Sequence, residues 1–185
     1  LDRSSAASDV YKRQATRHLL TLGHRRIGHV AGVATQQDAI DRLQGYRLAL
    51  AEAGVPFDPR LVFEGDFHEA SGIQAVEHWL GLGVGLSAIF AANDQMAYGV
   101  RLGLYRRGIR VPDDISLVGF DDLPASQFTL PPLTSVRQPL FEMGRHAAST
   151  VLLRLRAPEV RPEVSALPLT LSVRESVRYA PERAL

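Results

Sequence analysis

The chain has 185 residues, of which 45% are hydrophobic and 22% charged, and its 21 basic and 20 acidic side chains leave a formal charge of +1. This is the composition of one ordinary globular domain, with no overall field that would draw it onto nucleic acid or an anionic membrane. No apolar run approaches the roughly 20 residues that cross a bilayer, and no stretch resembles a signal peptide. The absence of cysteine excludes a disulfide framework. We therefore expect a cytoplasmic protein without a membrane partner.

The organised sequence is expected to begin after a tail. Residues 1–14, LDRSSAASDVYKRQ, show neither helical nor alternating periodicity. The next stretch, ATRHLLTLG, places Leu19, Leu20 and Leu22 on one helical face and ends at Gly23, a residue that favours the left-handed stop after a helix. The short apolar run RRIGHVAG then predicts a strand.

A longer helix is predicted for DAIDRLQGYRLALAEAG. Ile40, Leu43 and Leu50 recur at helical spacing and predict a buried face. Asp38 is the expected N-cap because its carboxylate can accept from free backbone N–H groups, and Gly54 is the expected stop.

Strands and helices then alternate to the end of DISLVGFDD. RLVFEGDF, SAIFAAND and DISLVGFDD read as strands, whereas EASGIQAVEHWLGLG and QMAYGVRLGLYRRG read as helices. Strands of about five residues alternating with helices of about ten to fifteen are typical of βαβ units. The predicted fold class is α/β, with a parallel sheet flanked by helices on both faces.

Polar or small residues follow each predicted strand. In an open parallel sheet, ligands bind outside the carboxyl ends of the strands, so these residues are candidates for a shared cleft. Their carboxylates, amide and aromatic ring suit a small molecule with hydroxyl groups and an apolar face. The alternative is that the Asn and Asp side chains only cap helices. The strand-end set comprises Gly32, Asp66, Phe67, Asn93, Asp94, Asp121 and Asp122.

Three longer stretches resemble one family. AANDQMAYGV, GIRVPDDISLVGFDDLPASQFTLPPLTSVRQP and DRLQGYRLALAEAG are similar, in order and spacing, to the effector-binding domain of LacI/GalR-type bacterial transcription regulators. The resemblance covers Ala15 to about Ser176. It implies a periplasmic-binding-protein fold of type I, in which two α/β subdomains joined by three crossover segments hold a small molecule between them. It also implies a preceding helix-turn-helix domain that binds operator DNA as a dimer.

The resemblance also implies a ligand site. In it, Asp121 would accept from vicinal hydroxyls, Arg42 would donate through its rigid fork and Phe67 would present a flat face to a ring. The expected ligand is a sugar or related polyol, with a purine as the alternative. The implied contact residues are Arg42, Phe67, Asn93, Asp121 and Gln138.

Two of these residues have simpler interpretations from the sequence. Arg42 can pair with Asp38 or Asp41 on its own helix, and Phe67 can belong to the core.

The other motifs in the sequence give little evidence of a metal site or of catalysis. The six histidines have no metal-ligand spacing, and no nucleophile elbow or paired acid and base is evident. We therefore expect no metal, no cofactor and no enzymatic activity.

The resemblance divides the chain into unequal parts. We expect a distal subdomain at 15–135, a crossover and one helix of a partial proximal subdomain at 136–160, a closing strand at 161–178 and a tail at 179–185. The DNA-binding helices and most of the proximal subdomain would then lie outside this chain, and ligand binding by the chain alone should be weak or undetectable. Without that subdomain, the apolar face of the helix at 139–157 (Met143, Ala147, Val151 and Leu155) would be exposed and would favour self-association.

The proline-rich stretch that follows the predicted strand DISLVGFDD is the expected dimer surface. Residues Leu123 to Phe128, with the helix that starts at Glu69, would form a symmetric interface, and packing of this loop within the monomer is the alternative. Two functions stay open at this stage. The first is the effector-sensing domain of a transcription regulator, and the second is a periplasmic sugar-binding protein of a transporter.

Overall fold

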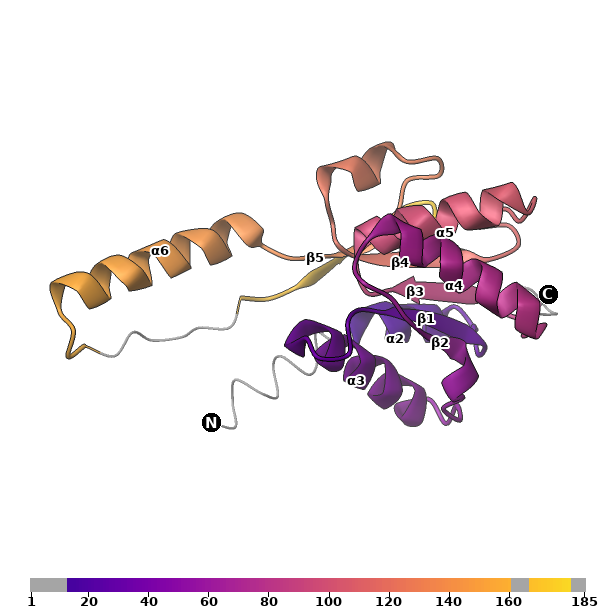
Figure 1. Ribbon diagram of the computed structural model, residues 1–185, viewed down its shortest axis with the longest axis horizontal. Helices are drawn as coiled ribbons and strands as arrows, with labels where there is room; N and C mark the ends of the chain where they lie inside the picture. The colour runs from indigo at the N-terminus through magenta and orange to yellow at the C-terminus, as the bar shows by residue number, and fades with distance from the viewer. Residues whose placement is uncertain (1–12, 161–166, 181–185) are drawn as a thin grey trace.

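Strands and helices alternate along the chain in the computed structural model, which describes residues 13–160 and 167–180 (Figure 1). The strands are β1 (Ile27–Ala31), β2 (Val62–Glu64), β3 (Ala88–Ala91), β4 (Ser116–Asp121), β5 (Thr134–Arg137) and β6 (Thr170–Ser172). The helices are α2 (Gln14–Thr21), α3 (Gln37–Glu52), α4 (Glu69–Leu82), α5 (Asp94–Arg106) and α6 (Leu140–Arg156), with short 3-10 helices η1 (Pro59–Leu61) and η2 (Pro124–Phe128).

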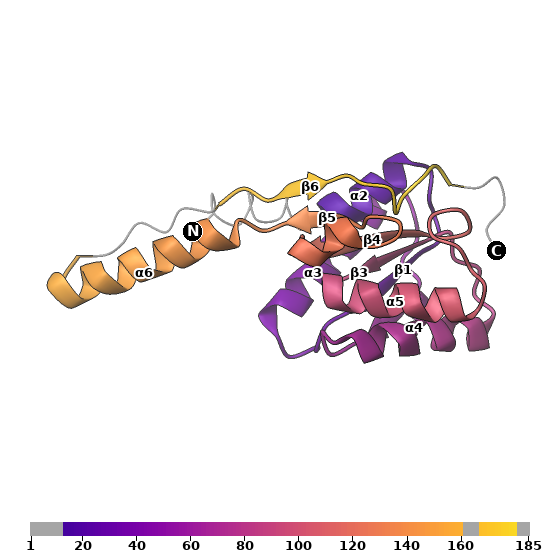
Figure 2. The same ribbon diagram turned by 90° about the horizontal axis from the view of Figure 1, so that it is seen from above.

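All six strands form one sheet in the order β2-β1-β3-β4-β5-β6. The neighbouring strands from β2 to β5 run parallel, as the alternation predicts. The edge strand β6, for which the sequence predicted no direction, pairs antiparallel with β5. The reason is visible in the path of the chain: α6 continues outward from β5, so the returning strand must run in the opposite direction (Figure 2).

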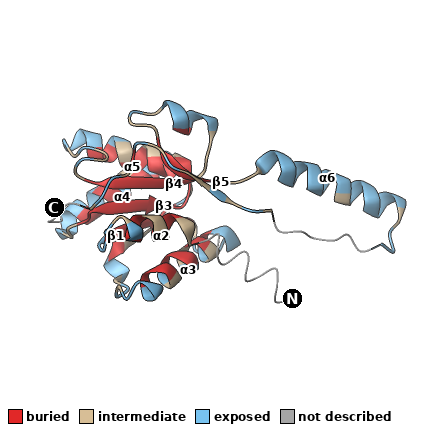
Figure 3. Ribbon diagram, turned by 180° about the vertical axis from the view of Figure 1, so that it is seen from behind, coloured by how far each residue is buried: buried red, intermediate tan, exposed pale blue. Residues whose placement is uncertain are grey.

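Each face of the sheet has its own hydrophobic core. Helices α2 and α3 cover one face, where the buried cluster includes Leu19, Tyr46 and Phe120. Helices α4 and α5 cover the other face around Trp79 and Met96. Figure 3 shows this burial concentrated in the strands and the inner sides of these four helices. The two cores explain why the central strands read as continuous apolar runs.

Helices α4 and α5 approach each other backbone to backbone, which requires glycine. A Cβ at Gly99 would lie 1.8 Å from the carbonyl oxygen of Glu69, and a Cβ at Gly72 would lie 2.1 Å from that of Met96. No side chain larger than hydrogen fits at either position without separating the helices. This contact fixes α5, and with it the polar residues at its start.

The ends of α2 and α3 confirm the predicted stops and correct one predicted start. Gly23 and Gly54 follow these helices with φ of 90° and 66°. The N-cap of α3 is Gln36, so the prediction of Asp38 was wrong; Asp38 lies in the first turn, where its charge still favours the helix dipole. Ile40 was expected on the buried face but is 44% exposed.

Helix α6 extends away from the sheet (Figures 1 and 2) and has no buried residue. The apolar side chains of Met143, Val151 and Leu155 are 43%, 58% and 74% exposed, which confirms the expected uncovered face. The chain then returns through β6 and is held along the sheet by Ser176, whose hydroxyl donates to Leu117 O at 2.6 Å. Ala180, placed in the expected tail, donates to Leu22 O at 2.8 Å.

The expected tail at 1–14 and the expected closing strand at 161–178 fall partly outside the described residues. Within the part of the chain that is described, β6 occupies the middle of the second range. The subdomain boundaries themselves stay predictions.

Candidate binding site

The carboxyl ends of the parallel strands bring the five implied contact residues to one edge of the sheet. Phe67 follows β2, Asn93 follows β3, Asp121 ends β4 and Gln138 follows β5, while Arg42 reaches the same edge from α3. Direct contacts connect these five residues into one cluster. Their role in binding a ligand stays a prediction.

Arg42 is the most buried charge of the cluster, with 7% of the residue exposed. One terminal nitrogen donates to the carbonyl oxygen of Ala92 at 2.8 Å, just beyond β3. The guanidinium carbon lies 4.1 Å from the ring centroid of Phe120 and 5.8 Å from that of Phe67. Burial lowers the pKa of Arg42, but a guanidinium stays charged at any physiological pH.

Arg42 lies near two carboxylates rather than one. Its second terminal nitrogen is 3.7 Å from Asp38 on its own helix and 3.8 Å from Asp121 on β4. The side chain of Asp38 is 76% exposed, so water screens that pair, whereas the side chain of Asp121 is only 21% exposed. The expected pairing of Arg42 with Asp38 on its own helix is therefore present, and the less screened pair is the one with Asp121 across the candidate site.

Asp121 is oriented by its backbone and by Gln138. Its φ is 105°, which is unusual for a residue other than glycine. The side-chain amide of Gln138 donates to one carboxylate oxygen at 2.6 Å. Burial raises the pKa of Asp121, and the hydrogen bond from Gln138 and the charge of Arg42 oppose that shift. The carboxylate is a hydrogen-bond acceptor held partly out of water.

Phe67 covers Gly32 with its ring. A Cβ at Gly32 would lie 2.0 Å from the ring Cζ, so only glycine allows the ring to occupy this place. Phe67 has a φ of 69° and is half-buried against the core of α4 and α5. The ring is therefore attached to the core along one side without being fully enclosed.

Asn93 is a helix cap as well as a cluster residue. Its side-chain oxygen accepts from Met96 N at 2.9 Å at the start of α5, and its amide donates to the carbonyl oxygen of Phe67 at 2.9 Å. The capping interpretation is correct, and the cap also anchors the loop that carries Phe67. Little of the residue, 6%, is exposed.

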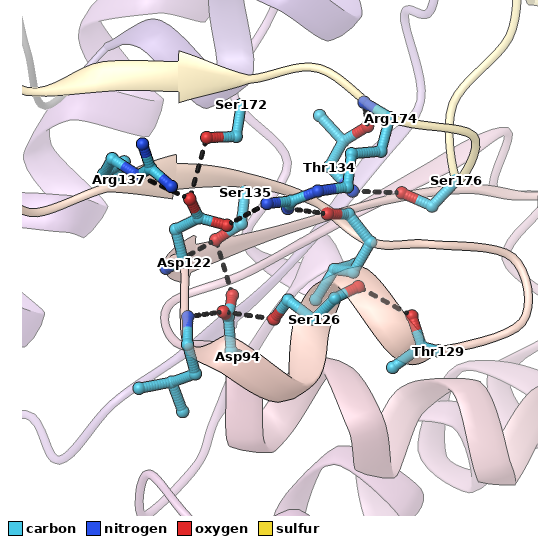
Figure 4. Close-up of polar contacts among 12 residues, drawn as sticks. Asp94, Asp122, Ser126, Thr129, Thr134, Ser135, Arg137, Ser172, Arg174 and Ser176 are labelled. Carbon is cyan, nitrogen blue, oxygen red and sulfur yellow. Dashed lines mark hydrogen bonds and ion pairs between the residues drawn. The ribbon is translucent and has the colours of Figure 1, made fainter.

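The strand-end set contains two adjacent polar pairs, Asn93–Asp94 and Asp121–Asp122. In each pair the side chain of the second residue is directed into the protein. Asp94 was placed in the strand-end set, but it is fully buried and accepts from Leu123 N at 2.7 Å, Ser126 Oγ at 2.5 Å and Ser135 Oγ at 2.6 Å (Figure 4). Burial raises the pKa of Asp94, and these three hydrogen bonds oppose the shift. Asp94 is thus a structural carboxylate.

The remaining acidic residues of the strand-end set, Asp66 and Asp122, also have partners of their own. Asp66 is exposed and accepts from His68 N at 2.9 Å, which shapes the loop before α4. Asp122 bonds to the ends of β5 and β6 rather than to the cluster around Arg42. The sequence analysis did not single out Ser126 or Ser135, because hydroxyl groups that bond across tens of residues leave no local pattern.

The described residues indicate neither a metal site nor a membrane-spanning helix. No group of three or more potential metal-ligating side chains occurs among residues 13–160 and 167–180. Over the same ranges, every helix is too short or too polar to cross a bilayer.

Comparison with known proteins identifies the family. Residues 16–177 match the periplasmic binding protein-like domain. The HTH-type transcriptional regulator CelR of Thermobifida fusca is 41% identical over 164 residues, which are 89% of this chain and 48% of that protein. The HTH-type transcriptional regulator GalR of Escherichia coli K12 is 46% identical over 138 residues, 75% of this chain and 40% of that protein. The chain belongs to the LacI/GalR-type periplasmic binding protein-like domains.

Solved structures agree with this assignment. The LacI/GalR-type domain superposes on a CelR–cellobiose complex with a TM-score of 0.86 at 40% identity, over 91% of this chain and 52% of that one. It superposes on a dimeric Lac repressor with an 11-residue C-terminal deletion with a TM-score of 0.86 at 32% identity, over 94% of this chain and 63% of that one. The chain spans about half the length of the curated relatives it matches.

Proposed function

We propose that this chain is the effector-sensing part of a bacterial DNA-binding transcription regulator, and that the cluster around Arg42 and Asp121 binds a sugar or related polyol. The observation that carries the proposal is the Arg42–Asp121–Gln138 contact beside the Phe67 ring at one edge of the sheet. The relatives support the regulator over the transporter protein, because CelR and GalR are both named as transcriptional regulators.

The chemistry of the cluster supports a hydroxylated ligand. The carboxylate of Asp121 accepts, the guanidinium of Arg42 donates, and each such charge-assisted hydrogen bond contributes roughly 1.5–3 kcal/mol. Two adjacent hydroxyl groups can satisfy both at once, while the ring of Phe67 covers the apolar face of a sugar. Cellobiose is the ligand of the related CelR complex, which gives the proposal its first probe.

A symmetric homodimer is part of the proposal. Ser126 of η2 is buried against Asp94, so the loop packs within the monomer on that side. On its outer side Phe128 and Leu130 are 79% and 84% exposed, next to a groove of 670 Å³ that also reaches Tyr105 of α5. Exposed apolar side chains beside a groove favour a protein partner. The related Lac repressor structure is dimeric.

Contact with operator DNA would come from the part of the regulator that precedes this chain, and the complete protein would act in the cytoplasm. The coding sequence upstream of Leu1 tests this part of the proposal. A helix-turn-helix is the expected result, whereas an export signal would contradict it and restore the transporter alternative.

The ligand class can be tested on the chain itself. ¹⁵N-labelled protein is titrated with cellobiose, glucose 6-phosphate and adenine. Changes in NMR chemical shift are measured because they detect the weak binding expected of one isolated subdomain. We expect saturable shifts with the neutral sugar and none with adenine. Saturable shifts with adenine but not with the sugar would contradict the proposal, and so would the absence of shifts with all three.

A further inference from the structure

A second buried carboxylate lies next to the candidate site and serves different partners. The side chain of Asp122 is 1% exposed and its φ is 57°. One oxygen accepts from Arg137 Nε and from Ser172 Oγ, each at 2.8 Å, and the other lies 2.7 Å from a terminal nitrogen of Arg174 (Figure 4). Burial acts to raise the pKa of Asp122, but the contacts with Arg174 and Ser172 outweigh it and leave the pKa below its usual value.

These partners belong to the two strands that connect the sheet with α6. Arg137 is the last residue of β5, where the chain leaves the sheet, and Ser172 is the last residue of β6, where it returns. The two strands are joined by three residue pairs, from Ser135 with Ser172 to Arg137 with Thr170. Since α6 has no buried residue, this short ribbon is its attachment to the rest of the described chain.

The backbone of Asp122 is linked to the start of α5. Ser135 Oγ accepts from the backbone N–H of Asp122 at 3.1 Å and donates to Asp94 at 2.6 Å. Asp94 directly follows Asn93, the cap that holds the Phe67 loop. Two hydrogen bonds and the Asn93–Asp94 peptide bond therefore connect the candidate site with the outgoing ribbon.

We propose that Asp122 is a positioning residue that fastens β5 to β6 and sets the direction in which α6 leaves the sheet. The arrangement is specific because two arginines converge on one carboxylate, Arg137 from the end of β5 and Arg174 from just beyond β6. A buried carboxylate that served only to fill space would be costly, since its charge must be compensated by partners. The inference concerns the ribbon and does not depend on which ligand the site binds.

The direction of α6 can be measured without a ligand. The chain contains no cysteine, so Gln74→Cys on α4 and Ser149→Cys on α6, both exposed, place two spin labels without side reactions. Pulsed electron paramagnetic resonance then measures the distribution of distances between the two spin labels. With the labelled protein diluted in unlabelled chain, so that distances between copies do not contribute, we expect one narrow distribution for the parent protein and a broader or double distribution for Asp122→Asn.

Matched variants separate positioning from general stability. Asp114→Asn removes a carboxylate that pairs with Arg110 away from the ribbon, and it should leave the distribution narrow. Arg137 is largely exposed, so Arg137→Gln can remove one partner of Asp122 without a risk to the core, whereas Arg137→Lys keeps the charge. We expect broadening with Arg137→Gln and rescue with Arg137→Lys.

The results for Asp122→Asn and Arg137→Gln together test whether Asp122 positions α6. If both Asp122→Asn and Arg137→Gln keep the narrow distribution of the parent, Asp122 does not position α6. If Asp122→Asn fails to fold, Arg137→Gln alone decides, because broadening supports the proposal and an unchanged width overturns it. Equal broadening in Asp114→Asn would also overturn it.

Discussion

Asp121 and Asp122 are neighbours in the chain, yet their carboxylates bond to different parts of the protein. Asp121 meets Gln138 and Arg42 at the candidate site, while Asp122 bonds to the β5–β6 ribbon. Both residues have positive φ, which turns the backbone sharply between them. Asn93 and Asp94 repeat this division one strand away. The first residue of each pair lies in the candidate site, and the second bonds to the structure beside it.

Replacement of Asp121 by asparagine should weaken sugar binding while the fold is retained. The loss of one charge-assisted hydrogen bond corresponds to about a tenfold to hundredfold weaker Kd. Stability should change little, because burial already disfavours the charged form of Asp121. NMR titration with cellobiose measures the Kd, and Asp113→Asn near the opposite end of the sheet serves as control. An unchanged Kd in Asp121→Asn would remove this residue from the site.

Gly32→Ala should displace the Phe67 ring. The new Cβ would lie 2.0 Å from the ring Cζ, so the loop that carries the ring must move. We expect changed aromatic contacts of Phe67 in NMR spectra and weaker sugar binding. Gly81→Ala is the matched control, since a Cβ there meets nothing within 4 Å. It should stabilise α4 by up to about 1 kcal/mol without any change at the site.

His29 should make the protein less stable in mild acid. Burial lowers the pKa of His29 to about 4, a hydrogen bond to Phe90 O partly opposes this, and the charges of Arg42 and Arg47 lower it further. The unfolded chain takes up this proton near pH 6.5, so the unfolded state binds more protons between pH 6.5 and about 4. Stability is therefore fully present above pH 6.5 and falls toward pH 4, by roughly 3 kcal/mol from this residue.

A phenylalanine at position 29 tests this origin. The histidine ring is stacked on Tyr46 and Phe90, with centroids 5.1 and 4.7 Å away, and its Nε2 atom has no hydrogen-bond partner among the described residues. His29→Phe keeps the stacking and cannot be protonated. Urea unfolding at several pH values should show a flatter dependence than in the parent protein. Equal slopes in the two proteins would assign the acid sensitivity to other groups.

The exposed face of α6 should cause self-association of this chain. Val151 and Leu155 are 58% and 74% exposed on a helix that packs against nothing in the described structure. We expect Val151→Glu with Leu155→Glu to shift sedimentation toward smaller species, with no loss of stability because neither side chain is buried. Ser149→Glu, on the same helix, should not have this effect. If the double variant sediments like the parent, α6 is not an association surface.

The outer side of η2 gives a separate test of the proposed dimer. Phe128→Glu places a charge on an exposed side chain beside the groove at Tyr105, and Ser126 keeps its bond to Asp94. Measured in the Val151→Glu, Leu155→Glu background, this change should convert any remaining dimer to monomer. A dimer that survives the substitution would place the interface elsewhere.

The sequence was sufficient to predict that the candidate residues meet at one edge of the sheet, but not which partners each of them has. Parallel strands must end at one edge, so Phe67, Asn93 and Asp121 could be placed together from the alternation alone. The inward orientation of Asp94 could not be predicted, because its partners Ser126 and Ser135 follow it by 32 and 41 residues. Contacts at that separation depend on tertiary packing rather than on local pattern.

One smaller error and one feature that was not predicted have the same origin. The helical pattern marked Ile40 as buried, but only the packing of α3 on the sheet decides which edge of an apolar face is covered. The antiparallel direction of β6 follows from the outward path of α6, which its own sequence does not specify. The family resemblance supplied Arg42 and Gln138, since neither stands at the end of a predicted strand.

The central claim is that a sugar binds at the sheet edge formed by Arg42, Phe67, Asn93, Asp121 and Gln138. Mapping of backbone amide shifts in ¹⁵N-labelled protein during titration with cellobiose tests it most directly. The account predicts that the largest saturable shifts fall on these residues and their neighbours in sequence, and that Asp121→Asn removes them. Shifts centred instead on the apolar pocket around Trp79 and Leu104, at the opposite end of the strands, would contradict it.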